Sequence, residues 1–189
     1  MKKILLVLLF FTSFLSFSQE EEKVKHHEFK ANTFNLIIFK AADFSYEYLI
    51  DSESSIGASI LFNLQNQEDI NDSNGPYYNE TFALTPFYRR YFSNKYAWGF
   101  FLEVFAMYNV QEDFDGYSYY DNINDVYLDT LGETSNNFAI GMSGGGKFVS
   151  KKGFAFEIYG GLGRNLSQSN NDVGSEIVPR LGASLGYRF

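Results

Sequence analysis

The residues best equipped for chemistry are seven charged side chains that stand inside otherwise apolar or small-residue stretches. They are Glu47, Arg89, Glu103, Lys147, Glu157, Arg180 and Arg188. Two carboxylates such as Glu103 and Glu157 could act as acid and base in glycoside cleavage if a sugar could reach them. Enclosed by protein, the acids and bases would instead form ion pairs, because an unpaired buried charge is costly. The elements that carry these residues decide between the two kinds of site.

Other catalytic patterns are weak in this sequence. The two histidines, His26 and His27, precede the first periodic segment, and the chain has no cysteine. Gly144-Gly145-Gly146-Lys147 superficially suggests a phosphate loop, but it lacks the flanking strand and helix that such a loop needs. We interpret it as closely packed strand. We therefore expect a protein that is not an enzyme and that has no cofactor and no metal centre.

Eight segments from residue 32 onward alternate apolar residues with small or charged ones. This period of two is that of a β-strand with one apolar face. Each segment is close to the roughly 9–11 residues that a tilted strand needs to cross a bilayer. The eight segments are Asn32–Lys40, Ala42–Ile50, Ser54–Asn63, Thr81–Phe92, Ala97–Asn109, Asn137–Val149, Gly153–Asn165 and Val178–Phe189.

The connections between the segments alternate in length. Tight turns alternate with long connections, and short periplasmic turns with long external loops are typical of outer-membrane barrels. The connection at Lys40 and Ala41 departs from this rule by being very tight. The tight turns are Asp51–Glu53, Ser93–Tyr96 and Ser150–Lys152, and the long connections are Leu64–Glu80, Val110–Asn136 and Leu166–Ile177.

Side-chain parity separates the charged residues from the apolar ones. In the first seven segments the apolar residues are even-numbered and the charged ones mostly odd-numbered, and in the last segment the parity reverses. The charged face also carries most of the small residues, such as Gly57, Gly141 and Gly161. An eight-stranded interior holds side chains and little more, so this face fits inside and the Phe-rich face fits lipid. We therefore predict an all-β fold, a closed eight-stranded antiparallel up-and-down transmembrane barrel.

The seven charged residues then point into the barrel, where a gated polar conduit and a packed ion-pair plug are both conceivable. We favour the plug, because eight-stranded interiors are filled by side chains. Three bases, Lys40, Arg90 and Arg164, have outward parity near strand ends, where long cationic side chains can reach the head groups. Pro86 lies inside the fourth segment and has no N–H, so we expect a bulge or a missing hydrogen bond there.

Residues 1–18 have the features of a cleavable signal peptide. Lys2 and Lys3 precede a short apolar core, and Ser16-Phe17-Ser18 is a small-x-small cleavage site. Cleavage would remove two lysines and no acid, which changes the formal charge from -8 to -10. Such an acidic chain is a poor partner for nucleic acid. We expect an exported protein with a periplasmic lead-in at residues 19–31 and a barrel domain at residues 32–189.

The long connection Val110–Asn136 holds seven acidic residues, several tyrosines and no Lys or Arg. Its carboxylates could bind Ca²⁺ and so bridge to lipopolysaccharide, although Asp113-Phe114-Asp115-Gly116 lacks the spacing of an EF-hand loop. A surface rich in Tyr, Asn, Ser and Gly also suits adaptable recognition. We therefore expect outer-membrane lipid and lipopolysaccharide as partners, and an extracellular protein or glycan as a candidate ligand.

The last ten residues alternate and end on an aromatic residue, with Leu185, Tyr187 and Phe189 on the apolar face. This strand resembles the C-terminal signal by which outer-membrane β-barrel proteins are recognised for insertion in Gram-negative bacteria. From about Asn32 onward the chain is similar to short, uncharacterised outer-membrane β-barrel proteins, and in architecture to the outer membrane protein A transmembrane domain and the outer membrane protein X family. The segments that carry the resemblance are Phe44-Ser45-Tyr46-Glu47-Tyr48, Leu84-Thr85-Pro86-Phe87-Tyr88-Arg89-Arg90-Tyr91-Phe92, Gly145-Gly146-Lys147-Phe148 and Leu185-Gly186-Tyr187-Arg188-Phe189.

The resemblance implies insertion by the barrel assembly machinery and supplies no catalytic residues. We expect an integral outer-membrane protein whose acidic loops serve envelope stability or adhesion. A narrow transport channel for a small or lipophilic solute is the alternative. A lipid A-modifying enzyme is a third hypothesis, and the lack of a histidine within the eight predicted segments argues against it.

Overall fold

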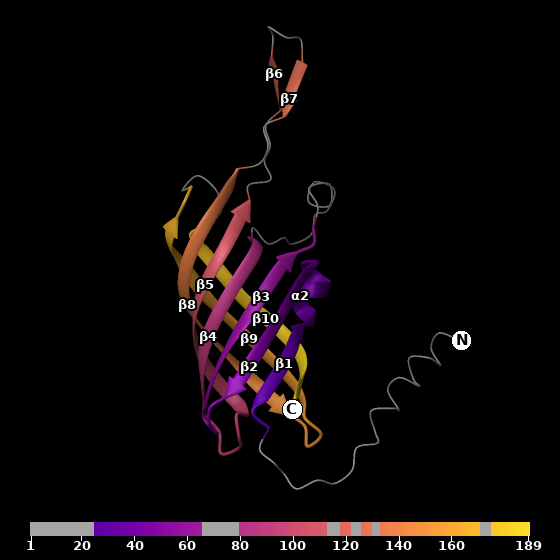
Figure 1. Ribbon diagram of the computed structural model, residues 1–189, viewed down its shortest axis with the longest axis vertical. Helices are drawn as coiled ribbons and strands as arrows, with labels where there is room; N and C mark the ends of the chain where they lie inside the picture. Colours follow the sequence, from indigo (N-terminus) through magenta and orange to yellow (C-terminus); the bar gives the residue numbers. More distant parts are fainter. Residues whose placement is uncertain (1–24, 66–79, 113–117, 122–125, 130–132, 171–174) are drawn as a thin grey trace, which may run out of the picture.

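The computed structural model shows a closed antiparallel β-barrel (Figure 1). It describes residues 25–65, 80–112, 118–121, 126–129, 133–170 and 175–189. Around the barrel the strand order is β1-β10-β9-β8-β5-β4-β3-β2, so that each barrel strand pairs with its neighbours in the chain and the last pairs with the first. The predicted all-β, eight-stranded up-and-down barrel is confirmed. The barrel strands are β1 (His27–Asn32), β2 (Ala41–Leu49), β3 (Ser54–Asn63), β4 (Glu80–Tyr91), β5 (Gly99–Glu112), β8 (Thr134–Val149), β9 (Phe154–Gln168) and β10 (Ile177–Arg188).

A small hairpin interrupts the connection between β5 and β8. Strands β6 (Ser118–Asp121) and β7 (Val126–Asp129) pair with each other as a separate two-stranded sheet. In Figure 1 this hairpin projects beyond the end of the barrel that carries the long connections. The chain terminus at Phe189 lies at the opposite end, beside the short turns. Phe189 and the β6–β7 hairpin therefore lie at opposite ends of the barrel.

The side chains point as their parity predicts in the seven strands whose positions were correctly predicted. Along β2, Phe44 and Tyr46 are exposed whereas Asp43 and Glu47 are buried. In β10 the parity is reversed, and Arg180 is among the buried residues. Because residues paired across antiparallel strands share a face, this pattern continues around the wall. The barrel is therefore apolar outside, and its interior holds the charged side chains together with two apolar clusters, one around Phe87 and Phe105 and one around Tyr91 and Phe101.

The predicted first segment is wrong. Residues His27–Asn32 form β1, and the following residues form the short helix α2 (Thr33–Ile38). Asn32 caps this helix, since its side chain accepts a hydrogen bond from the backbone N–H of Asn35 at 3.2 Å. The barrel thus begins at His27, inside the stretch that we assigned to the lead-in. The apparently tight connection at Lys40 is in fact a helical one.

Pro86 interrupts one ladder and leaves the register unchanged. The pairing of β4 with β5 omits Thr85 and Pro86, between the pairs Leu84↔Tyr108 and Phe87↔Phe105. On its other side Pro86 is paired with Ala58 of β3. The missing pairing is as predicted, because proline has no N–H to donate. The bulge of this ladder lies elsewhere, between Glu80 and Phe82.

The turn between β2 and β3 is organised by Asp51. Its carboxylate accepts hydrogen bonds from the backbone N–H groups of Glu53 and Ser54 and from the Ser54 hydroxyl, each at 2.7 Å. The Ser54 hydroxyl, together with these backbone donors, holds the pKa of Asp51 below its ordinary value of 3.8. The ionised form of this exposed side chain therefore favours the folded turn.

This lowered pKa predicts a pH-dependent effect of Asp51→Asn. A carboxyl group with a depressed pKa in the folded state stabilises that state above its unfolded pKa, and the contribution is lost as the pH falls through the folded pKa. The variant should therefore be less stable than the original protein at pH 7, and the difference should close below pH 3.8. Unfolding in detergent micelles, followed by the fluorescence of the single tryptophan, Trp98, measures it. A difference that is independent of pH would contradict the assignment.

Candidate functional site

The barrel interior holds a continuous network of charged side chains. All seven charged residues predicted to face inward are buried, and β1 contributes two more. In order of contact the network runs Arg188, Glu28, Lys147, Glu47, Lys30, Glu157, Arg89, Glu103 and Arg180. Each of its four carboxylates contacts at least two of its five bases, so that no acid of the network is left unpaired.

Lys30 and Lys147 occupy the part of the network nearer the short turns. Lys147 Nζ donates to Glu28 at 2.7 Å and to Glu47 at 2.8 Å. Lys30 Nζ donates to Glu47 and, at 2.9 Å, to Glu157. Glu47 also accepts hydrogen bonds from hydroxyl groups, those of Ser55 and Tyr91. Glu47 is therefore the acid with the most partners in the network.

Arg89 joins the two halves of the network. Its Nε donates to Glu103 at 2.6 Å, and its Nη1 donates to Glu157 at 2.8 Å and to Glu47 at 3.1 Å. The guanidinium lies over the rings of Phe87 and Phe101, 4.5 and 4.4 Å from their centroids. These rings supply apolar packing and cation–π attraction to a buried base.

Arg180 and Arg188 terminate the network at its two ends. Arg180 Nε donates to Glu103 at 2.6 Å, and Ser143 donates to the same carboxylate at 2.8 Å. At the other end, Arg188 donates to Glu28 at 2.6 Å and to the carbonyl oxygen of Ala97 at 2.8 Å. Arg188 thus ties the last strand to the turn between β4 and β5.

This arrangement favours a packed plug over a catalytic pair. Glu103 and Glu157, the two carboxylates considered for glycoside cleavage, are both bound by Arg89. A general acid must hold a proton and reach a substrate, whereas these groups are fully ion-paired and buried. An interior cavity of about 20 Å³ lies on the long-loop side of the network. It is too small to hold a sugar.

Glu28 and Lys30 were missed because they lie in the stretch that we assigned to the lead-in. The residues Glu28 to Asn32 do alternate, with Phe29 outward and Lys30 inward, which was the available signal. The charged residues that precede them made this alternation hard to recognise, since a charged tail and the charged inner face of a strand have similar sequences over five residues.

The histidines also lie elsewhere than predicted. His27 belongs to β1, so the barrel strands do contain a histidine, although the eight predicted segments do not. Its Nδ1 lies 2.6 Å from the Tyr46 hydroxyl, and its ring stacks on Phe189. His26 lies 2.8 Å from the carbonyl oxygen of Leu49. Among the described residues these contacts join the histidines to aromatic and backbone groups, which is not the Ser and carboxylate setting of a hydrolase.

The pattern Gly-x-Ser-x-Gly occurs twice, at residues 141–145 and 182–186. In hydrolases it carries the nucleophile at an exposed turn from strand to helix. Here both copies lie within strands, and Ser143 and Ser184 are buried inside the barrel. They are small residues of the inner face and have no exposed hydroxyl.

The predicted insertion signal, Leu185, Tyr187 and Phe189, lies on the outer face, with all three side chains exposed. The backbone of Phe189 exchanges two hydrogen bonds with His27, at 2.8 and 3.2 Å, which close β10 onto β1. This orientation leaves the three apolar side chains accessible to a partner. Their recognition by an assembly machinery stays a prediction.

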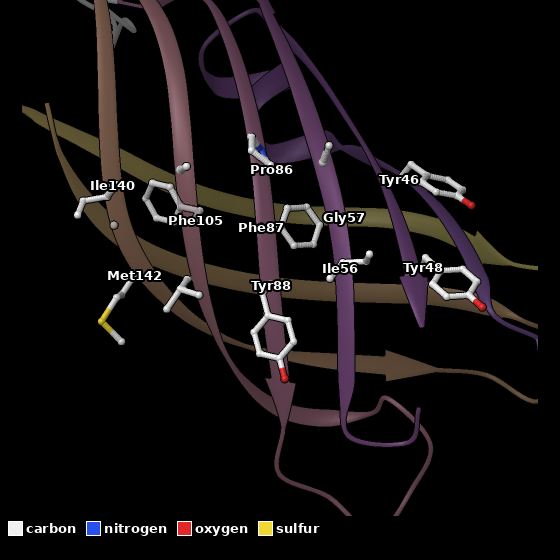
Figure 2. A pocket seen from close by; sticks show the side chains of 14 residues that line it. Tyr46, Tyr48, Ile56, Gly57, Pro86, Phe87, Tyr88, Phe105, Ile140 and Met142 are labelled. Atoms are coloured by element: carbon white, nitrogen blue, oxygen red, sulfur yellow. The ribbon is translucent and has the colours of Figure 1, made fainter. Parts of the chain in front are cut away.

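Among the pockets formed by the described residues, one large hollow lies on the outer wall of the barrel. Its volume is about 860 Å³. Figure 2 shows it over β2 to β5 and β8. The small outward residues Ala58, Pro86 and Ala106 line it, with Tyr88 and Met142 beside them. Its lining is almost wholly apolar, so it suits hydrocarbon rather than a polar substrate.

Within the described residues, no cluster of His, Asp and Glu is placed to hold a metal ion. Asp113 and Asp115, on which the calcium hypothesis rests, lie outside the described residues, as does the predicted signal peptide. No helix in the described part of the chain has the length and hydropathy of a membrane span.

The fold and the interior together define a class, that of small closed β-barrels with an apolar exterior and an ion-paired interior. Comparisons of the chain with protein-family models, with curated proteins and with solved structures gave no match.

Proposed function

We propose that this protein is an integral outer-membrane β-barrel that holds its acidic loops at the cell surface, in envelope stability or adhesion, without conducting through its centre. The observation that carries the proposal is the reversed polarity of the barrel. Large apolar side chains such as Ile56, Phe100 and Leu162 are exposed around the wall, while the nine charged residues of the network are enclosed. In water the exposed apolar face would be strongly unfavourable. In a bilayer this face contacts hydrocarbon, while the charged residues pair with one another inside the barrel.

Charged pairs mark both ends of the apolar wall. Arg90 pairs with Glu53 at the short-turn end, and Arg164 pairs with Glu176 at the long-loop end, at 3.1 Å. Both pairs are well exposed, as expected for groups at the level of lipid head groups. These two arginines were predicted to reach the head groups, and their acidic partners were not predicted.

The packed ion pairs inside the barrel support a lumen that is closed to ions. Ions crossing the lumen would have to separate Arg89 from Glu47 and Glu157, which are buried and in contact. Breaking a buried pair leaves uncompensated charges, which is costly. The channel hypothesis would therefore need a large rearrangement of the network.

Fractionation and folding gels test the membrane proposal. The protein should stay in the outer-membrane fraction after carbonate extraction and should migrate anomalously on a gel until it is boiled. Release as a soluble protein by carbonate would overturn the proposal. Planar-bilayer recordings should show no steady conductance from the folded protein, and a sustained open state would favour the channel instead.

A further inference from the structure

The hollow on the outer wall is a gap in the layer of outward side chains. Pro86 of β4 is paired with Ala58 of β3, and the register between β4 and β5 places Ala106 on its other side. Three small side chains therefore lie next to one another across the wall, whereas the neighbouring outward residues along β4 are Leu84 and Tyr88. The small residues form the floor of the hollow, and larger ones such as Tyr88 form its sides.

The hollow is already large enough for a ligand. Its volume of about 860 Å³ lies in the range of roughly 300–1,000 Å³ that small-molecule sites occupy. No strand or side chain has to move to create it, in contrast to the interior cavity of about 20 Å³. Its apolar lining suits a hydrocarbon chain, so an amphiphile bound there would need polar partners at one end.

Polar groups lie at the short-turn end of the hollow. Figure 2 shows the Tyr88 ring beside the hollow with its hydroxyl directed toward the short turns. Arg90 follows on the same outward face of β4 and forms an ion pair with Glu53, and both side chains are about half exposed. Asp51, in the same turn as Glu53, is near enough for the charge of Arg90 to act on it. The foot of the hollow therefore presents a base with acids beside it.

The spacing of these groups matches the depth of one membrane leaflet. Residues of a strand rise by about 3.4 Å each, so Arg90 lies about 14 Å from Pro86 along β4. A strand tilt of about 40° leaves roughly 10 Å of this distance along the membrane normal. The hydrocarbon layer of one leaflet is about 15 Å thick, half of the bilayer core. With Arg90 at the level of the head groups, the hollow lies beside the acyl chains of the leaflet on the short-turn side.

The charges at the foot of the hollow suit a zwitterionic head group. The Arg90 guanidinium carries several N–H donors, and Glu53 is bound through Nη2. A phosphate can therefore bind to Arg90 while the ion pair stays intact. The Glu53 carboxylate keeps acceptor positions for an ammonium group, and Asp51 adds negative charge in the same turn. A lipid with negative charge only would meet these acids without a cation of its own.

We propose that the hollow is a binding site for a phospholipid with a phosphoethanolamine head group, from the leaflet on the short-turn side. One acyl chain lies in the hollow, across Pro86 and Ala106. The phosphate accepts hydrogen bonds from Arg90 and from the Tyr88 hydroxyl, and the ammonium group donates to Glu53. This inference rests on the proposed membrane location.

Quenching of tryptophan fluorescence by lipids with brominated acyl chains tests the site, because bromine quenches a ring that the chain contacts. The reporter is Met142→Trp, in the lining of the hollow, in a Trp98→Phe background that removes the single natural tryptophan. In phosphatidylcholine vesicles, brominated phosphatidylethanolamine should be favoured over brominated phosphatidylcholine by about fivefold, the upper range for a half-exposed charge pair. Choline has no N–H to donate to Glu53, and brominated phosphatidylglycerol, which lacks a cation, should show no such preference. If Met142→Trp does not insert, Val104→Trp on the neighbouring strand lines the same hollow and makes the same comparison.

A reporter outside the hollow separates this site from lipid contact in general. Ile158 is exposed on β9, which contributes no residue to the hollow. In the same Trp98→Phe background, Ile158→Trp should be quenched by all three brominated lipids alike.

Substitutions at the two ends of the site test the head group and the chain separately. Glu53→Gln removes the partner of the ammonium group, and Ala106→Phe fills the floor of the hollow. Each should abolish the preference for phosphatidylethanolamine at the Met142→Trp reporter. The matched control is Glu176→Gln, which removes the exposed pair with Arg164 at the long-loop end and should leave the preference unchanged.

Equal quenching by the three brominated lipids at the Met142→Trp reporter would overturn the site, as would a preference for phosphatidylglycerol. Quenching at the Ile158→Trp reporter alone would mean that another occupant, such as a second copy of the chain, covers the hollow, and would overturn it too. These results leave the membrane proposal intact, because the Ile158→Trp reporter still contacts lipid. Absence of quenching at both positions would refute the membrane location and the site with it.

Discussion

Replacing Glu47 by alanine is expected to lower the free energy of unfolding by about 3–5 kcal/mol, the range for removing one partner of a buried ion pair. Glu47 is fully buried and contacts Lys30, Arg89 and Lys147. The variant would leave three buried cations with Glu28, Glu103 and Glu157 as their remaining acidic partners. Urea unfolding of the refolded protein in micelles, followed by Trp98 fluorescence, measures the change.

The matched control is Glu53→Ala. Glu53 pairs with Arg90, but both side chains are about half exposed, at 50% and 49%. Exposed pairs contribute about 0–1 kcal/mol because water screens them. If Glu47→Ala unfolds at the same urea concentration as the control, the interior is hydrated and the plug does not exist. A destabilised Glu47→Ala variant that still shows no conductance would support the plug.

The reversed polarity of the barrel was predictable because it depends on a period of two alone. Glu47, Arg89 and Glu103 each alternate with large apolar neighbours, and a strand must place such neighbours on opposite faces. Neither long-range contacts nor the size of the barrel enters this argument. The same reasoning located all seven predicted interior charges on the buried face.

The first strand could not be located by the same rule. Phe34, Leu36 and Ile38 alternate like a strand, yet they belong to α2, because Asn32 caps a helix and a run of six residues fits either structure. The true strand carries Glu28 and Lys30, whose charges resemble those of the tail before them. Alternation over so few residues does not decide between the two.

Which acid of the network pairs with which base also could not be predicted from the sequence. Lys30 and Glu157 are 127 residues apart and meet at 2.9 Å. Which acid meets which base depends on the stagger of the strands, which sets the height of each side chain inside the barrel. The sequence predicts that the charges must pair, and the closed sheet determines the partners.

A Gly141→Val substitution is the second change with a large expected effect. Gly141 lies on the inner face of β8, and the ring of Phe105 fills the space where a side chain would be. An added Cβ would lie 2.5 Å from the carbonyl oxygen of Leu162 and 2.5 Å from Gly163 Cα, both of which are backbone atoms that cannot rotate away. We expect a loss of more than about 3 kcal/mol, the upper end of ordinary overpacking.

Gly160→Val makes the same change on the outer face and serves as its control. A Cβ at Gly160 meets Leu181 Cδ2 at 3.5 Å, an ordinary contact. In a bilayer the added valine surface would face hydrocarbon, so we expect this variant to fold and to stay in the membrane like the original protein. The pair therefore tests the orientation of the whole wall. If the face of Gly141 were the open one, the substitution at Gly160 would be the damaging one, and refolding yields on a heat-modifiability gel would reverse.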